Sequence, residues 1–211
     1  MAAETSQTLD RGLRVLRVLA EEPAGLTVTE LATRLEVNRT VAYRLIATLE
    51  QHALVRRDAR GRVCVGLGIL HLASAVQPLL RDLSVPILRA LAETVGATAH
   101  LTIADGAEAL ALAVVEPSWT DFHVAYRVGS RHPLDAGAAG RAISLTDPSG
   151  PAYAVSTGEL QSGAHGLAAP VRGVDGLQAS VGIVTLGSAI DEGVVAPRVI
   201  AAAQDLAAAL S

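Results

Sequence analysis

Apolar residues recur every three or four positions through the first fifty residues, in three separate stretches. Residues 8–21 are predicted to form an amphipathic helix that ends before a proline. A second, shorter helix begins at Thr27 and Glu30, which form a capping box ahead of the next apolar stripe. Asn38 is a suitable N-cap for a third helix over residues 39–52.

The third of these helices has two different faces. One face is apolar, and we expect it to be buried. The other face carries residues spaced three and four apart, namely Thr40, Tyr43, Arg44 and Ala47. Two short helices joined by a tight turn, the second with a polar and cationic face, are typical of a helix-turn-helix.

A basic hairpin is predicted directly after the three helices. Residues 54–57 and 62–65 flank a Gly-containing loop at 58–61, as in a β-hairpin. Four arginines lie on or near its tip: Arg56, Arg57, Arg60 and Arg62. Three helices followed by a basic hairpin give the order of elements in a winged helix-turn-helix.

This arrangement is suited to double-stranded DNA. An α-helix fits the major groove, where Arg can bond guanine, and hairpin arginines can meet phosphates or the minor groove. The segment 39–62 contains six arginines against Glu50 and Asp58, a local net charge of +4. The alternative is a small helical domain whose arginines are only a solvated face. The predicted DNA contacts are Thr27, Thr29, Asn38, Arg39, Thr40, Tyr43, Arg44, Arg57, Arg60 and Arg62.

Composition and charge remove several other function classes. The whole chain of 211 residues has a net charge of -4, and all of its 17 cationic residues are arginine. Without lysine there is no P-loop lysine and no Schiff-base lysine. The single cysteine, Cys64, fits a reducing compartment and supports neither a disulfide nor a zinc site. We find no secretory signal, membrane span, cofactor fingerprint or catalytic motif, and expect a cytoplasmic protein that is not an enzyme.

The middle of the chain is predicted to be a helical linker, residues 67–96, with a dimer-forming surface. Its apolar pattern runs to Pro78, and a second helix is expected from an N-cap at Ser84 to Val95.

After residue 97 the apolar period changes to that of β-strands mixed with short helices. The predicted elements are a hairpin (98–104 and 108–115), a strand (122–128), a short helix (137–145), a second hairpin (166–171 and 177–186) and a closing helix (191–210). Strands with flanking helices, rather than repeated βαβ units, indicate an α+β domain.

Four histidines in this part are candidate metal ligands or ligand contacts: His100, His123, His132 and His165. None of them has a partner at ligand spacing and no cysteine supports them, so a structural or pocket-lining role is favoured and no metal is expected. His100 is on a predicted strand and is a candidate contact for a bound molecule. Core packing is expected for Phe122, whereas Trp119 is a candidate to close a pocket or an interface.

Residues 27–70, TVTELATRLEVNRTVAYRLIATLEQHALVRRDARGRVCVGLGIL, resemble the N-terminal domain of IclR-family bacterial transcription regulators. Arg44 stands at the family's arginine of the recognition helix, and Glu36 stands where the family usually has a glycine in the turn. Two later segments, residues 128–142 and the run GAHGLAAPV from Gly163 to Val171, also resemble this family.

The resemblance implies a GAF-like antiparallel-sheet effector domain that holds the carboxylate of a small molecule. In the family, backbone amides in the first segment and side chains on later strands hold this group. Gly166 and Gly182 stand where family members commonly have a pocket Cys and Ser, and the stretch between Leu145 and Tyr153 is much shorter than in the family. The pocket is therefore expected to be open, enlarged or degenerate. The effector residues implied by the resemblance, together with His100, are His100, Gly129, Ala136, Gly137, Ala138, Glu159, Gly166 and Gly182.

The sequence thus predicts three regions: a winged helix-turn-helix (1–66), a helical linker (67–96) and an effector-binding and oligomerisation domain (97–211). The expected function is a homodimeric or tetrameric regulator that binds a near-palindromic operator and responds to an effector. The alternative is an architectural DNA-binding protein whose C-terminal domain binds no ligand and only oligomerises.

Overall fold

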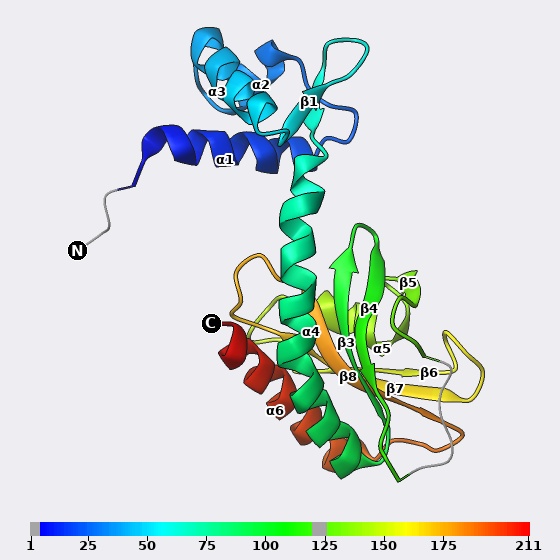
Figure 1. Ribbon diagram of the computed structural model, residues 1–211. Helices are drawn as coiled ribbons and strands as arrows, with labels where there is room; N and C mark the ends of the chain where they lie inside the picture. Colours follow the sequence, from blue (N-terminus) through cyan, green and yellow to red (C-terminus); the bar gives the residue numbers. More distant parts are fainter. Residues whose placement is uncertain (1–4, 120–125) are drawn as a thin grey trace. The chain divides into compact units, whose positions relative to one another are not determined.

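The computed structural model describes residues 5–119 and 126–211. The chain forms two compact units, Met1–Val76 and Gln77–Ser211, and each is described by itself. Figure 1 shows a helical unit with a small hairpin and a second unit built on a curved sheet.

The first unit has the predicted winged helix-turn-helix topology (Figure 1). Its elements are α1 (Gln7–Ala20), α2 (Val28–Arg34), α3 (Arg39–Gln51), β1 (Val55–Arg57) and β2 (Val63–Val65). Val15, Leu31 and Ile46, one from each helix, are fully buried in one apolar cluster. We call the antiparallel hairpin of residues 55–65 the wing.

The predicted helix starts are confirmed. The N–H of Thr27 donates to Glu30 Oε2 (2.7 Å), and the N–H of Glu30 donates to Thr27 Oγ1 (3.2 Å), which completes the capping box. Asn38 Oδ1 accepts a hydrogen bond from the N–H of Val41 (2.9 Å) at the start of α3. Between α2 and α3, Glu36 has φ = +55°, the left-handed conformation that favours glycine.

The linker is one helix, so the prediction of two helices was wrong. α4 runs from Gly68 to Val95 with Pro78 and Pro86 inside it, and the boundary between the two units falls within its length. Ser84 is not an N-cap, because its Oγ donates to the carbonyl of Arg81 within the helix (3.2 Å). A proline removes one helical hydrogen bond, but apolar burial along residues 80–92 offsets this loss.

The second unit contains a six-stranded antiparallel sheet in the order β5-β4-β3-β8-β7-β6. Its strands are β3 (Thr98–Asp105), β4 (Glu108–Val115), β5 (Arg131–Pro133), β6 (Ala154–Thr157), β7 (Ala164–Val171) and β8 (Ala179–Leu186). The helices α5 (Gly137–Ile143) and α6 (Glu192–Leu210) complete the unit. The α+β class, both long hairpins and both helices are confirmed.

Strand alternation divides the sheet into two faces. Ala99, Leu101 and Ile183 face a large apolar core shared with α6 and the second half of α4. The opposite face carries polar residues such as His100 and Ser180, and α5 covers it: the hydroxyl of Ser180 donates to an α5 carbonyl (3.0 Å). Polar groups are therefore buried on one face only.

Two short edge strands were not predicted. β5 and β6 are the two edge strands of the sheet. They contain only three and four residues, which is too few for an alternating apolar pattern to stand out in the sequence. Of the strand predicted at 122–128, residues 122–125 lie outside the described residues, including Phe122 and His123, and 126–128 are not in a strand.

α6 is the one helix in the described part of the chain that is long and apolar enough to cross a membrane. One face of α6, including Val199 and Leu206, is fully buried in the core of the second unit, whereas Val194 is exposed. One-sided burial of this kind is typical of an amphipathic helix on a folded domain.

Candidate functional sites

The outward face of α3 is the first candidate site. Ala42, Leu45 and Ile46 are buried and fix the helix against the first unit's core. The opposite side is exposed and carries the predicted residues Thr40, Tyr43, Arg44 and Ala47, with Arg39 exposed at the start of the helix. The exposed fraction of Tyr43 is 47%, which leaves its ring available for contact.

The tip of the wing is organised by one carboxylate. Asp58 Oδ1 accepts hydrogen bonds from the N–H groups of Arg60 and Arg62, both at 2.8 Å. These bonds to the ionised form hold the pKa of Asp58 below its usual value. Gly61 completes the turn with φ = +76°. The side chain of Arg60 is exposed at this tip.

Two of the arginines predicted to contact DNA are bonded to other groups within the protein. Arg57 Nε lies 3.0 Å from Glu50 Oε1, which ties the wing to the end of α3. Arg62 donates to the carbonyl of Gly25 from both Nε (3.0 Å) and Nη2 (2.8 Å), and it also pairs with Glu30 (3.2 Å). Arg62 therefore links the wing to the loop before α2.

Of the remaining predicted contacts, some cap helices and others are exposed. Thr27 and Asn38 cap the helices α2 and α3, and Thr29 is exposed in the first turn of α2. Arg39 and Arg44 form no ion pair within residues 5–119 and 126–211. The face of α3 thus presents uncompensated positive charge.

Gly25 packs closely against the wing, and the sequence analysis did not identify this contact. It has φ = +71°, and a Cβ atom there would lie 2.5 Å from the Sγ atom of buried Cys64 and 2.8 Å from the carbonyl of Val63. The bridge between Leu26 and Val63 requires this close approach. The positive φ could not be inferred from one glycine in a loop.

A cavity of about 80 Å³ between the polar face of the sheet and the segment 156–164 is the second candidate site. We call it the ligand cavity. Its walls include His100, Tyr126, His132, Ala139, Ser156, Glu159, Leu160, Gly166 and Ile183. Three of the predicted effector residues are therefore at the wall, and Gly137, Ala138 and Gly182 adjoin it through direct neighbours. Gly129 and Ala136 are not among its lining residues.

The predicted amide cradle is already bound by side chains of the chain itself. The N–H of Gly137 donates to Glu159 Oε2 (3.0 Å), and the N–H of Ala138 donates to Ser156 Oγ (3.0 Å). Arg141 forms an ion pair with the same glutamate. The hydrogen bond from Gly137, aided by Arg141, lowers the pKa of Glu159 and keeps its carboxylate ionised.

The two glycines at the expected Cys and Ser positions do not enlarge the cavity. A Cβ atom on Gly182 would lie 2.7 Å from both Ala168 Cβ and His100 Cε1. A Cβ atom on Gly166 would lie 2.9 Å from Ser156 Oγ. Their backbones are packed closely against these neighbours, so the structure lends no support to enlargement at these two positions, which was one of the three alternatives for the pocket.

A chain of buried polar groups runs along the cavity wall. His100 Nδ1 is 3.1 Å from Thr102 Oγ1, which is 3.3 Å from the hydroxyl of Tyr126. Burial lowers the pKa of His100 to about 3, so its ring is neutral at physiological pH. Burial likewise raises the pKa of Tyr126. Strand alternation places Thr102 beside His100, but nothing local in the sequence indicates Tyr126.

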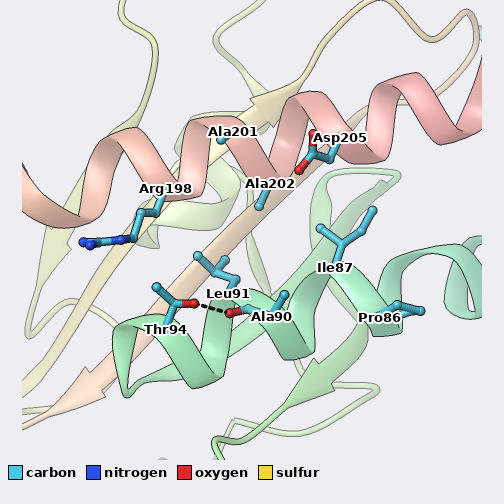
Figure 2. Close-up of a pocket in the computed structure, with 9 residues that line it drawn as sticks. All are labelled: Pro86, Ile87, Ala90, Leu91, Thr94, Arg198, Ala201, Ala202 and Asp205. Carbon is cyan, nitrogen blue, oxygen red and sulfur yellow. Dashed lines mark hydrogen bonds between the residues drawn. The ribbon is translucent and has the colours of Figure 1, made fainter.

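A larger, open groove lies between α4 and α6, with a volume of about 460 Å³ (Figure 2). Small apolar side chains, including those of Ala90 and Ala202, line this groove, while Arg198 and Asp205 lie at separate positions along α6. The Thr94 hydroxyl is bonded to the carbonyl of Ala90 (2.7 Å). No predicted effector residue lines this groove, and no polar groups converge in it.

Trp119 does not close the ligand cavity. Its indole packs over Gly96, where a Cβ atom would lie 2.7 Å from the ring, and its Nε1 donates to the carbonyl of Glu93 (3.4 Å). With 64% of its surface exposed, it stays a candidate for an interface.

The described chain thus combines a winged helix-turn-helix unit with an α+β sheet unit that contains a small cavity. Comparison with known sequences identifies the family of both units. The IclR helix-turn-helix domain matches residues 8–59, and the C-terminal domain of bacterial transcriptional regulator IclR matches residues 72–152. Together these matches span more than half of the chain, which belongs to the IclR family.

Individual relatives support this assignment. The chain is 29% identical to the HTH-type transcriptional regulator KipR of Bacillus subtilis over 65% of its own length and 55% of KipR. It thus spans about half the length of the curated relatives it matches. An IclR transcriptional regulator from Alicyclobacillus acidocaldarius has a similar fold, with a TM-score of 0.55 and 22% identity over 99% of this chain and 100% of that one. An IclR homologue from Microbacterium hydrocarbonoxydans, solved with 4-hydroxybenzoate, has a TM-score of 0.55 and 19% identity over 97% and 99% of the chains.

Proposed function

We propose that this protein is a cytoplasmic DNA-binding transcriptional regulator whose operator affinity is modulated by a small-molecule effector. The observation that supports it most directly is the exposed, uncompensated cationic face of α3 beside a structured wing. In this proposal α3 enters the major groove, Arg44 reads a base edge, and the wing contacts the backbone. Arg39, Thr40 and Tyr43 lie on the same face and supply further contacts.

The direct test is a fluorescence-anisotropy titration of operator DNA taken from upstream of the protein's own gene. Arg44→Ala removes a side chain that is exposed and unpaired among the described residues, so the fold is retained. One bidentate arginine-guanine contact contributes about 1–3 kcal/mol of discrimination, so specific binding should fall by roughly 5- to 150-fold. Arg89→Ala, an equal loss of charge in the second unit, is the matched control. An affinity of the Arg44 variant within about twofold of the original would overturn the recognition-helix assignment.

We further propose that the protein acts as a homodimer or tetramer on a near-palindromic operator. In the first unit, Leu67, Leu70, Leu72 and Val76 are each half exposed or more, which leaves an apolar surface suited to a second copy. Sedimentation of Leu70→Glu tests this: the assembly should dissociate at micromolar concentrations. If the variant kept the assembly intact, this surface would not be the interface.

The alternative of an architectural protein is supported by one observation. The amide donors of Gly137 and Ala138 are bound by the chain's own Glu159 and Ser156, so a carboxylate effector requires these groups to move. Thermal-shift measurements separate the two functions, since a ligand stabilises the folded state in proportion to ln(1 + [L]/Kd). Operator binding that no ligand alters would favour the architectural function.

A further inference from the structure

The ligand cavity is small and has few open polar positions. Its volume of about 80 Å³ is well below the roughly 150 Å³ of a protein cavity that accepts benzene. This volume corresponds to a molecule smaller than benzene. Leu160 supplies an apolar side chain to the walls, and the polar side chains of the lining are those of His100, Tyr126, His132, Ser156, Glu159 and Gln161.

Negative charge is disfavoured in this cavity. Glu159 lines it as a carboxylate, and the two amide donors at the start of α5, those of Gly137 and Ala138, are occupied by Glu159 and Ser156. The guanidinium of Arg141 is paired with Glu159 as well. An incoming carboxylate would thus lose water, meet a like charge and find no open donor at this helix start.

His132 provides one unsatisfied group. It is 93% buried, and its Nδ1 lies 3.0 Å from the carbonyl oxygen of Pro133. A carbonyl only accepts hydrogen bonds, so Nδ1 carries a proton, and in the Nδ1–H tautomer Nε2 is an acceptor. Nε2 is buried and has no hydrogen-bond partner in the described structure. Buried polar groups without a partner are uncommon, and this one belongs to a cavity wall.

We propose that the ligand cavity takes a small uncharged molecule that donates a hydroxyl or N–H hydrogen to Nε2 of His132. Short alcohols and simple amides are the matching chemical class. His100, Thr102 and Tyr126 form a neutral polar wall beside the same space. This inference rests on the proposed function, because it names the effector class of that regulator.

Four probes of equal heavy-atom count test the proposal on the full chain. 2-Propanol and acetamide donate a hydrogen, acetone only accepts one, and acetate carries the charge. Long-range ¹H–¹⁵N NMR of the histidine rings should first show His132 as the Nδ1–H tautomer. The two donors should then shift its Nε2 resonance and saturate at roughly millimolar concentration, as expected for so few atoms. Acetone and acetate should leave it unchanged.

Variants give a second measurement. His132→Phe keeps a ring but removes the acceptor, and should weaken 2-propanol binding by about tenfold. His165→Phe, on β7 but outside the cavity lining, should leave it within about twofold. Acetate or acetone binding as tightly as 2-propanol, or no response to any probe, would overturn the proposal. The wild-type spectra decide the matter if His132→Phe does not fold.

Operator titrations on the same samples keep the two proposals apart. Intact operator binding without any probe response contradicts the ligand class alone. A probe response without operator binding contradicts the proposed function alone.

Discussion

In the first unit the cationic side chains of α3 point outward without ion-pair partners among the described residues, whereas in the second unit the polar groups around the cavity are bound to one another. A DNA-binding face has to present its donors to a large external partner. A small cavity has to satisfy its donors until a ligand arrives. Truncating a side chain should therefore have opposite effects in the two units. In the first unit it should weaken DNA binding, because a contact is lost. In the second unit it should expose hydrogen-bond donors that a ligand can then bind.

The largest effect is expected where the winged unit is most tightly packed. Gly25→Ala places a Cβ atom 2.5 Å from Cys64 Sγ at a positive φ, and should lower the free energy of unfolding by about 2–4 kcal/mol. Gly61→Ala is the matched control, since it has a similar φ but no atom within 4 Å of the added Cβ. Urea denaturation measures both variants. If both variants lost the same free energy of unfolding, the positive φ, rather than crowding against the wing, would explain why glycine is needed at position 25.

Glu159→Ala should uncover the anion site that the carboxylate now fills. The N–H of Gly137 and the guanidinium of Arg141 would lose their partner, and charge-assisted hydrogen bonds to a ligand contribute about 1.5–3 kcal/mol. Acetate affinity, measured by calorimetry, should therefore rise by about ten- to a hundredfold. Unchanged acetate binding would show that the amides do not form a cradle.

The same contact has a defined pH dependence. The folded-state pKa of Glu159 lies below its ordinary value of 4.5, so its stabilising effect is present above pH 4.5 and is lost as pH falls through the folded pKa. Wild type should be more stable than Glu159→Gln at pH 7, and the gap should close in acid. A gap that widened in acid would contradict an ionised cap.

Arg62 and Arg60 should separate stability from DNA affinity. Arg62→Ala removes two bonds to the carbonyl of Gly25 and should cost about 1–2 kcal/mol of stability. Arg60→Ala should leave stability unchanged and reduce the salt dependence of DNA binding by about one phosphate contact. Denaturation and salt titrations on both variants check this. If Arg60→Ala lowered stability and Arg62→Ala reduced only the salt dependence of DNA binding, these two assignments would be contradicted.

The smallest effect concerns the turn between α2 and α3. Glu36→Gly removes the strain of a left-handed conformation at a residue with a side chain. The free energy of unfolding should rise by about 0.5–1 kcal/mol, reduced by the larger conformational entropy that glycine gives the unfolded chain. Thermal denaturation resolves a change of this size. A loss of stability would show that the glutamate side chain contributes a favourable contact.

Local signals in the sequence were sufficient for the winged unit. The capping box at Thr27 and the N-cap at Asn38 act within four residues, so their geometry follows from short-range chemistry. The prolines of α4 led to a wrong boundary, because tertiary burial outweighs a local preference.

The ligand cavity depends on contacts that are distant along the chain. Glu159 reaches Gly137 across 22 residues, and the backbone at Gly182 lies against His100 through strand pairing. The family resemblance identified these positions but not their contacts. Sequence spacing alone could not show that a glutamate fills the cradle or that Nε2 of His132 has no hydrogen-bond partner among the described residues.

The packing around Gly25 and Gly96 also gives each unit its own probe. The only cysteine of the chain, Cys64, is a buried residue of the wing whose Sγ lies against Gly25, so its alkylation rate reports how often the first unit opens. The only tryptophan, Trp119, stacks on Gly96 in the second unit, so its fluorescence follows that unit instead. Thiol labelling and fluorescence on one unmodified sample can therefore time the two units separately while DNA or ligand is added.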